Sequence, residues 1–205
     1  MLEVPNDVTK PRDRRTERKQ ATRAEIVDAA WELCAAEGLA GLSLRDLAAR
    51  VGMQAPSLYS YFDSKHAIYD AMFAEGFRQF NAYRVIPEGA TTLDGLRSLA
   101  HRFAEFCTAS PVRYQLMFQR TIPGFEPSPE SYAISAAGFA DYAAWMASHE
   151  IAHATDMYTG VMTGLVDQQL SNEPGGDRWL RLIDDAMAMV LSYAESTKPK
   201  RRARK

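Results

Sequence analysis

The sequence predicts an all-α protein in which an N-terminal head with a helix-turn-helix precedes a second, larger helical unit. Three observations support this fold class. Apolar residues recur at helical spacing along most of the chain. Ser, Thr and Asp residues stand where helices would begin, which is where their side chains can accept hydrogen bonds from free backbone N–H groups. No stretch has a convincing strand pattern, and no internal repeat occurs.

The most informative stretch runs from Ser43 to Lys65. Ser43 can cap a helix whose apolar residues recur at i, i+3, i+4 and i+7, namely Leu44, Leu47, Ala48 and Val51. Gly52 permits the positive φ that ends this helix, and Pro56 suits the first turn of a second, short helix. The outer face of the second helix carries Gln54, Ser57 and Tyr61, with Tyr59 and Ser60 beside them. Two short helices around a glycine turn, with small polar groups outside, are typical of a helix-turn-helix that enters the major groove.

The flanking segments define the expected domains. A helix is expected from Arg18 to Glu37, before Gly38. Ser64 caps a helix from Lys65 to about Tyr83 whose apolar stripe is longer than a three-helix head can bury. This helix therefore connects the head to the second unit. The expected division is a flexible basic arm, a helix-turn-helix domain, a helical ligand-binding and dimerisation domain, and a basic tail, at 1–17, 18–66, 67–197 and 198–205.

Charge is unevenly distributed, although the formal net charge is only −2. Acidic and basic residues balance in 1–66, acidic residues dominate 67–197, and 198–205 holds basic residues without an acidic one. This pattern suits a protein that touches DNA with one end. The polar start excludes a signal peptide, and no apolar run reaches the roughly 18 residues of a membrane span. Cys34 and Cys107 lie in apolar helical patterns, so we expect two buried free thiols and a cytoplasmic protein without a membrane partner.

Aromatic and Met residues crowd the middle of the chain and could line a cavity for an apolar or amphipathic effector. His149 or Tyr158 would supply a polar anchor. The alternative is an ordinary packed core at helical spacing. The candidate pocket residues are Phe106, Tyr114, Met117, Phe118, Trp145, His149, Tyr158 and Met162.

Two further helices are expected, one that Ser148 caps and that runs to about Leu170, and a last one that Asp177 caps. The spacing of Gly160 and Gly164 suggests that a neighbouring backbone packs closely against the first of these helices.

A rival hypothesis rests on residues 149–153, which fit the zinc-peptidase pattern H-E-x-x-H. On a helix, His149 and His153 would share one face and Glu150 could act as a base. The longer form of the motif is absent, because Asp156 and Thr159 stand at its remaining places. Metal binding as a regulatory effector, or two polar residues that line a pocket or an interface, are the other interpretations of this pair.

The head resembles the DNA-binding signature of TetR-family transcriptional regulators. That signature has a Ser/Thr-started helix, an L-A-x-x-x-G turn, and L-Y-x-Y/H-F before a Ser-Lys helix start. The matching pieces are Leu47-Ala48, Gly52, Leu58-Tyr59-Ser60-Tyr61-Phe62 and Ser64-Lys65. The helix before them also matches, so the resemblance covers roughly residues 18–80.

The resemblance implies an all-helical homodimer of about nine helices that acts as a small-molecule-responsive repressor. It implies that the last two helices, at about 150–171 and 177–195, dimerise as a four-helix bundle. The residues that it places near phosphates are Ser43, Arg45, Tyr59, Tyr61 and Lys65. Those that it places near base edges are Gln54, Ala55, Pro56 and Ser57.

Two residues depart from the family pattern. Gln54 stands where a small hydroxyl residue usually caps the recognition helix, and Gln is a poor cap, so its side chain can face the DNA instead. A Gln amide suits adenine N6 and N7, and a good base contact contributes about 1–3 kcal/mol of discrimination. His66 stands where an acidic residue is commoner, and it could add a phosphate contact.

The function that follows is a DNA-binding transcriptional regulator without enzymatic activity, cofactor or catalytic metal. It is expected to be a repressor that binds a palindromic double-stranded operator as a homodimer and that a small molecule releases. The alternatives are a zinc-dependent hydrolase built on His149 and His153, and a dimer that stays on DNA without a ligand.

Overall fold

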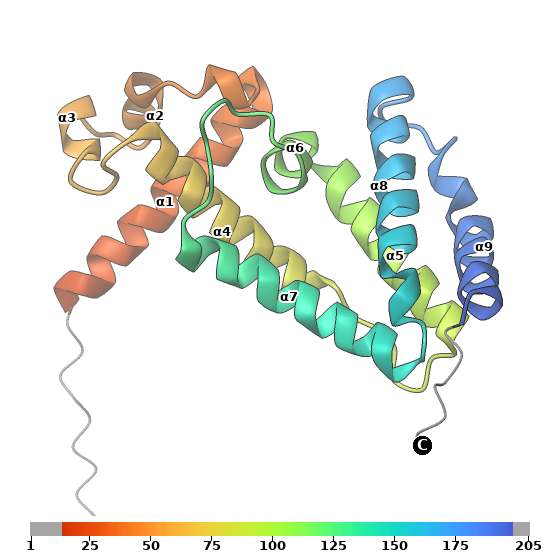
Figure 1. Ribbon diagram of the computed structural model, residues 1–205. Coiled ribbons are helices and arrows are strands. Elements are labelled where there is room, and N and C mark those ends of the chain that lie inside the picture. The colour runs from red at the N-terminus through yellow and green to blue at the C-terminus, as the bar shows by residue number, and fades with distance from the viewer. Residues whose placement is uncertain (1–13, 199–205) are drawn as a thin grey trace, which may run out of the picture.

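The computed structural model describes residues 14–198, which form nine α-helices and three short 3-10 helices without a strand. The predicted all-α fold class is confirmed. Figure 1 shows the head at one end, built from α1, α2, α3 and the start of α4, and the body at the other end. Most of the expected basic arm and tail lies outside the described residues.

The head helices begin and end at local signals. α1 runs over Arg14–Glu37, so it starts before the predicted Arg18 and includes residues that were assigned to the arm. Arg, Glu and Lys are good helix formers, and Glu17 in the first turn favours this longer start. A 3-10 turn, Leu39–Gly41, leads to α2, Leu44–Arg50, where the Ser43 side chain accepts a hydrogen bond from the Asp46 N–H. α3 is short, Ala55–Leu58.

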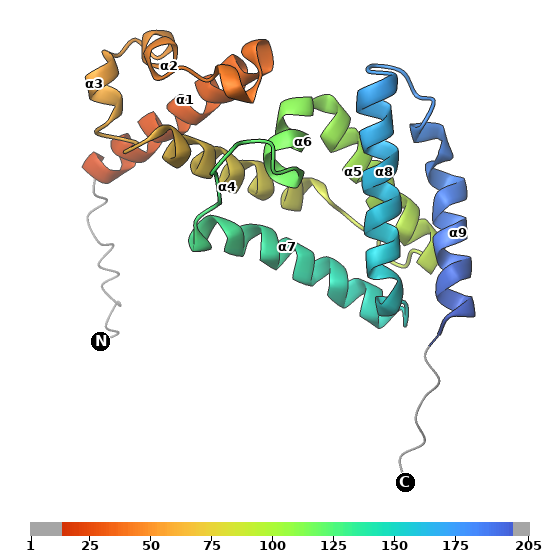
Figure 2. The ribbon, with the colours of Figure 1, turned by 45° about the horizontal axis from the view of Figure 1, so that its top comes forward.

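α4, Lys65–Tyr83, passes from the head into the body, where it lies beside α7 (Figures 1 and 2). The Ser64 hydroxyl caps it, accepting from the Ala67 N–H at 3.1 Å. Its first turns belong to the head core, through Ile68 and Met72, and its later turns form a separate aromatic cluster with Phe77 and Phe80. The predicted connecting role of this helix agrees with that division.

The body contains five further helices. They are α5, Thr92–Ala109; α6, Pro111–Phe118; α7, Pro129–Ser148; α8, Thr155–Asn172; and α9, Ile183–Ser196. Its main core lies between α5, α8 and α9. Figure 2 shows α8 and α9 side by side at the end of the molecule away from the head.

Two predicted helix starts are wrong. Ser148 ends α7 rather than capping α8, because Glu150 adopts a left-handed φ of 58° and a 3-10 turn, Ala152–Ala154, follows. Asp177 does not cap α9: its carbonyl accepts from the Arg181 N–H in the 3-10 turn Leu180–Leu182, and α9 starts at Ile183. In each case a 3-10 turn precedes the helix, and its backbone hydrogen bonds take the place of the expected side-chain cap.

The close-approach prediction for α8 is also wrong within this chain. No heavy atom of the described residues lies within 4 Å of a Cβ built on Gly160 or Gly164, and both glycines are exposed. Other glycines do lie in close contact with a neighbouring helix, and Gly95 of α5 is one of them. A Cβ at Gly95 would lie 2.2 Å from the indole ring of Trp145 on α7.

We therefore expect Gly95→Ala to lower the free energy of unfolding by about 1–3 kcal/mol, because the added methyl group must displace a packed ring. Urea denaturation at one fixed protein concentration measures this change. In a Trp145→Phe background the clashing ring atoms are absent, so the same substitution should cost much less. An equal cost in both backgrounds would contradict the assigned contact.

Candidate DNA-binding face and ligand cavity

The residues expected to touch DNA lie on one outer region of the head, along α2 and α3 and the turns that flank them. Arg45, Gln54, Pro56, Ser57 and Tyr59 are exposed, and Ser43, Ala55, Tyr61 and Lys65 are half-buried. Gln54 has extended backbone and makes no side-chain capping bond, as expected for a poor cap. Its amide is therefore not used at the start of α3.

The charged and aromatic side chains of this face differ in how many contacts they already make within the head. The Arg45 side chain is 89% exposed, and its only ion pair among described residues is at 3.5 Å to Asp46. Lys65 is already used by the head, because its ammonium donates to the Ala40 carbonyl at 3.2 Å and lies 5.5 Å from the Tyr69 ring centre. Tyr61 packs against the head core, and its carbonyl accepts from the Arg23 guanidinium. Arg45 is thus the freest cation on this face for a phosphate.

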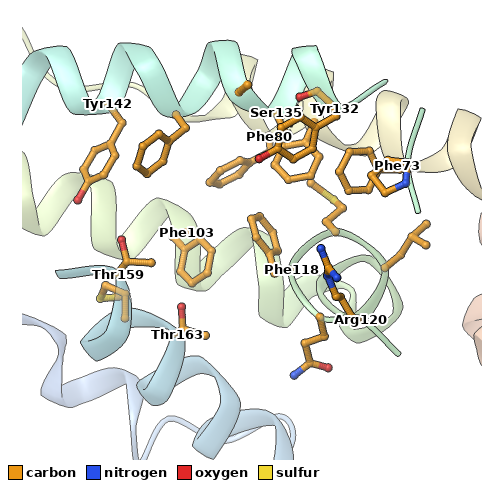
Figure 3. A pocket seen from close by; sticks show the side chains of 18 of the residues that line it. Phe73, Phe80, Phe103, Phe118, Arg120, Tyr132, Ser135, Tyr142, Thr159 and Thr163 are labelled. Carbon is orange, nitrogen blue, oxygen red and sulfur yellow. Dashed lines mark hydrogen bonds between the residues drawn. The ribbon is translucent and has the colours of Figure 1, made fainter. Parts of the chain in front are cut away.

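The body contains a cavity of about 690 Å³, within the range of small-molecule sites. Its walls come from α4 to α8 and from the segment between α6 and α7. Figure 3 shows Phe73, Phe80, Phe103 and Phe118 along its length, with Tyr142 and Thr159 at one end and Arg120 towards the other. Most of the lining is apolar, as expected for a site that removes an apolar ligand from water.

Half of the predicted pocket residues line this cavity: Met117, Phe118, Tyr158 and Met162. The others have different contacts. Phe106 packs on Phe80 at 5.1 Å between ring centres, and Trp145 stacks on His149 at 4.3 Å. Tyr114 is buried in the body core. His149 cannot be the polar anchor, because its ring lies outside the lining and is held by the Trp145 carbonyl at 2.9 Å.

Several lining residues were not predicted, above all the phenylalanines of α4 and the polar groups Arg84, Tyr142, Ser135, Thr159 and Thr163. The signal for α4 was present, since its apolar stripe is longer than the head requires. Which residues of that stripe face a cavity depends on how α6, α7 and α8 pack against α4, and the sequence does not show this.

A polar corner interrupts the apolar lining. Arg84 follows the last residue of α4, and its guanidinium donates to the Gly138 carbonyl on α7. It lies 5.6 Å from the Phe80 ring centre and 6.0 Å from that of Tyr142. Burial lowers the pKa of Arg84 from its ordinary value, and raises the pKa of the Tyr142 and Tyr158 hydroxyls, which therefore stay protonated.

The segment between α6 and α7 joins the cavity to the head. Gln119 to Ile122 and Phe125 to Pro127 line the cavity. Phe125 also packs on Tyr69 and His66 of α4, with ring centres 5.8 and 6.0 Å apart. Anything that moves this segment therefore acts on the first turn of α4, directly after the helix-turn-helix.

The structure does not support the rival hypothesis of a helical zinc site. His149 is the C-cap of α7, Glu150 is left-handed, and His153 lies in a 3-10 turn, so the two imidazoles do not share a helix face. His153 is within 2.9 Å of the Ala194 carbonyl through Nε2. In residues 14–198, no three His, Cys, Asp or Glu side chains are grouped to hold a metal ion.

Both thiols are buried and free, as predicted. Burial raises the pKa of Cys34 to about 11 and raises that of Cys107 further, so neither is a reactive thiolate near neutral pH. Over residues 14–198, no helix has the length and apolarity that a bilayer crossing requires.

Residues 26–72 match the family model of bacterial regulatory proteins, tetR family. These residues hold most of α1, all of α2 and α3, and the start of α4. The head of this chain is thus similar to the tetR family of bacterial regulatory proteins. The chain is 33% identical over 81 residues to the class D tetracycline repressor protein of Escherichia coli. This alignment covers 40% of the present chain and 37% of that relative. The chain thus matches little more than a third of this relative's length.

Solved structures extend the likeness from the head to the whole fold. A TetR-family transcriptional regulator from Streptomyces coelicolor superposes with a TM-score of 0.70 at 14% identity, over 86% of this chain and 83% of that one. A TetR variant from Acinetobacter baumannii AYE, solved in complex with minocycline, gives 0.63 at 18% identity, over 86% and 98%. At these identities the likeness shows the shared fold.

Proposed function

We propose that this protein is a transcriptional repressor that binds a palindromic DNA operator as a homodimer and is released by a small molecule. The observation that carries the proposal is the exposed surface of α3 and its two caps, where Gln54, Ser57 and Tyr59 face solvent within the segment that is similar to the tetR family. Residues 18–66, with the earlier turn of α1, form the DNA-binding head, and residues 67–197 form the ligand-binding and dimerisation domain. The tetracycline repressor, a relative over this domain, supports repression as the activity.

On this proposal, phosphate contacts position the head and base contacts select the sequence. Arg45 contacts phosphates, with Ser43, Tyr59, Tyr61 and Lys65 beside it. Gln54 and Ser57 face base edges, and Ala55 and Pro56 allow close approach of the backbone. The helix-turn-helix carries these groups on the exposed side of the head.

The dimer is proposed to form through α8 and α9. Both helices lie at the end of the body away from the head (Figure 2). Large apolar side chains are exposed there, with Met189 at 72% and Met157 at 42%. Gly160 and Gly164 would let a partner helix approach closely, which gives their spacing a role across the interface. Two heads held at about 34–36 Å would read two half-sites one helical turn apart.

Release follows from the position of the cavity. A ligand that favours one arrangement of residues 119–127 acts on α4 through Phe125 and shifts the spacing of the two heads. A neighbour in fold binds minocycline, which supports a ligand site in this type of body. The alternative of a dimer without a ligand is less well supported, since the body contains a cavity of ligand size.

Selection from a random duplex library tests the function. We expect enrichment of an inverted repeat with half-sites about one helical turn apart. Arg45→Ala should weaken binding to every duplex and make the salt dependence shallower by about one unit in the log–log slope. Gln54→Ala should instead relax the preference at one base pair per half-site, with a loss of about 1–3 kcal/mol of discrimination. Fluorescence anisotropy over a salt series measures both effects.

Arg78→Ala is a matched control, since it removes an exposed arginine from the part of α4 that lies in the body. The absence of an enriched repeat would refute the proposed function. If Gln54→Ala weakened all duplexes equally, the assignment of Gln54 to a base edge would be wrong.

A further inference from the structure

The polar corner of the cavity contains hydrogen-bond donors without acceptors. Tyr142 is 6% exposed and lines the cavity, and its hydroxyl has no hydrogen-bond partner. Figure 3 shows this hydroxyl pointing from α7 towards Thr159 on α8. A weak hydrogen-bond contact with the Thr159 side chain opposes the rise in the Tyr142 pKa, but that contact falls outside the distance and angle of a formed hydrogen bond, and no other described group pairs with the hydroxyl. A buried hydroxyl is rarely left unpaired, so this one indicates a missing acceptor.

Arg84 adds a charge to the same corner. A guanidinium has five N–H donors, and Arg84 uses one amino group on the Gly138 carbonyl. No carboxylate of residues 14–198 forms an ion pair with it. Asp141 attracts it from α7, but that carboxylate is exposed and screened by water. The side chain therefore has donors to spare beside the Tyr142 ring.

We propose that the cavity takes an apolar ligand that ends in a carboxylate, with Arg84 and Tyr142 donating to the two carboxylate oxygens. The proposal rests on the ligand-binding role proposed for the cavity. A guanidinium and a second donor match the planar, two-oxygen acceptor, and such charge-assisted bonds are short and strong where water is excluded. The carboxylate supplies the missing acceptor and the counter-charge.

The rest of the cavity suits the apolar body of such a ligand. Its phenylalanines meet edge to face, with Phe118 at 5.2 Å from Phe103 and 5.5 Å from Phe80 between ring centres. Arg120, the other cation of the lining, is exposed, and Glu126 lies in the same segment of the chain. A carboxylate at Arg120 would stay hydrated and contribute little. The carboxylate of the ligand therefore lies at the buried end of the cavity, beside Arg84 and Tyr142, and its apolar part lies along the phenylalanines.

Two matched probe pairs test the proposal: decanoate with 1-decanol, and biphenyl-4-carboxylate with biphenyl-4-methanol. Isothermal titration of the full-length protein without DNA should give at least about tenfold tighter binding of an acid than of its alcohol. The two pairs distinguish an acyl chain from an aromatic ring system as the body of the ligand. Arg84→Gln should weaken acid binding by about ten- to a hundredfold and leave alcohol binding within threefold.

Two control variants separate the anchor from the apolar wall. Arg120→Gln should leave the acid-to-alcohol ratio unchanged, and Phe103→Leu should weaken both members of a pair equally. Tyr142→Phe, which keeps the ring and its packing, should lower the ratio by about three- to tenfold. This variant keeps the test valid if Arg84→Gln fails to fold.

Equal binding of acid and alcohol, no binding of either pair, or loss of the ratio in Arg120→Gln would overturn the carboxylate site. Operator binding is measured separately by anisotropy. If an acid binds through Arg84 but leaves operator affinity unchanged, the carboxylate site stands and ligand-induced release is wrong. If no operator exists, the repressor function fails while the titrations still decide the site.

Discussion

Leu116→Ala is expected to lower the free energy of unfolding by about 2–5 kcal/mol. Leu116 belongs to α6 in the body, yet its side chain is 4% exposed and packs in the head core with residues of α1 and α4. Truncation would leave a void at the joint between head and body. We expect amide hydrogen exchange to rise mainly in α1 and the first turns of α4, although the substitution lies in the body.

Val166→Ala is the matched control. Val166 is fully buried in the body core between α5, α8 and α9. Its truncation should raise exchange in those helices and leave the head protected. If Leu116→Ala raised exchange only within the body, α6 would not be part of the head core and the mechanical joint would lie elsewhere.

Asp70→Ala should cost about 2–4 kcal/mol, because one carboxylate holds the start of α7 against α4. Its oxygens accept from the Ser128 N–H at 2.7 Å, the Ser128 hydroxyl at 2.9 Å and the Ser131 hydroxyl at 2.8 Å. Alanine would leave the donors of half-buried Ser128 and buried Ser131 without their acceptor, and hydrogen bonds to a charged group contribute more than neutral ones. Urea denaturation at fixed protein concentration measures the loss.

Asp70→Asn is the conservative control. Its amide oxygen can still accept from the Ser128 N–H, and its NH₂ group can donate to the serine hydroxyls. We therefore expect it to lose less than half of what Asp70→Ala loses. A change below about 0.5 kcal/mol in Asp70→Ala, the size of an ordinary surface substitution, would show that the junction does not depend on this carboxylate.

The head was predictable because its signals are local. Ser43 and Ser64 cap helices through bonds to residues three positions on, and Gly52 takes the positive φ that its turn requires. Such interactions depend on a few neighbouring residues and hardly on the rest of the chain. The outer polar face of α3 follows from the same short stretch.

Local signals were ambiguous in the body. Ser148 and Asp177 are capping residue types, but neither caps a helix there. Glu150 takes a left-handed conformation that its side chain does not favour, in the turn that connects α7 to the 3-10 turn Ala152–Ala154. Because of this turn, residues 149–153 do not form an α-helix, and the H-E-x-x-H spacing does not place the two histidines on one helix face.

The sequence also could not show which apolar side chains line the cavity and which are packed in the core. Met117 and Phe118 line it while Phe106 and Trp145 do not, although all four belong to apolar stripes. Periodicity shows that a residue faces inward, but it does not show whether a neighbour fills the space. Arg84 gave no sequence signal, since an arginine after a helix end is ordinarily solvated.

The sequence by itself determined the all-α class and the helix-turn-helix from Ser43 to Lys65, because capping, turn chemistry and helical spacing act over a few residues. Only the tertiary structure decided where the helices of the body end, which aromatic residues leave a space between them, and that Arg84 and Tyr142 meet in it. Those features depend on contacts between residues more than fifty positions apart, such as that of Arg84 with Gly138.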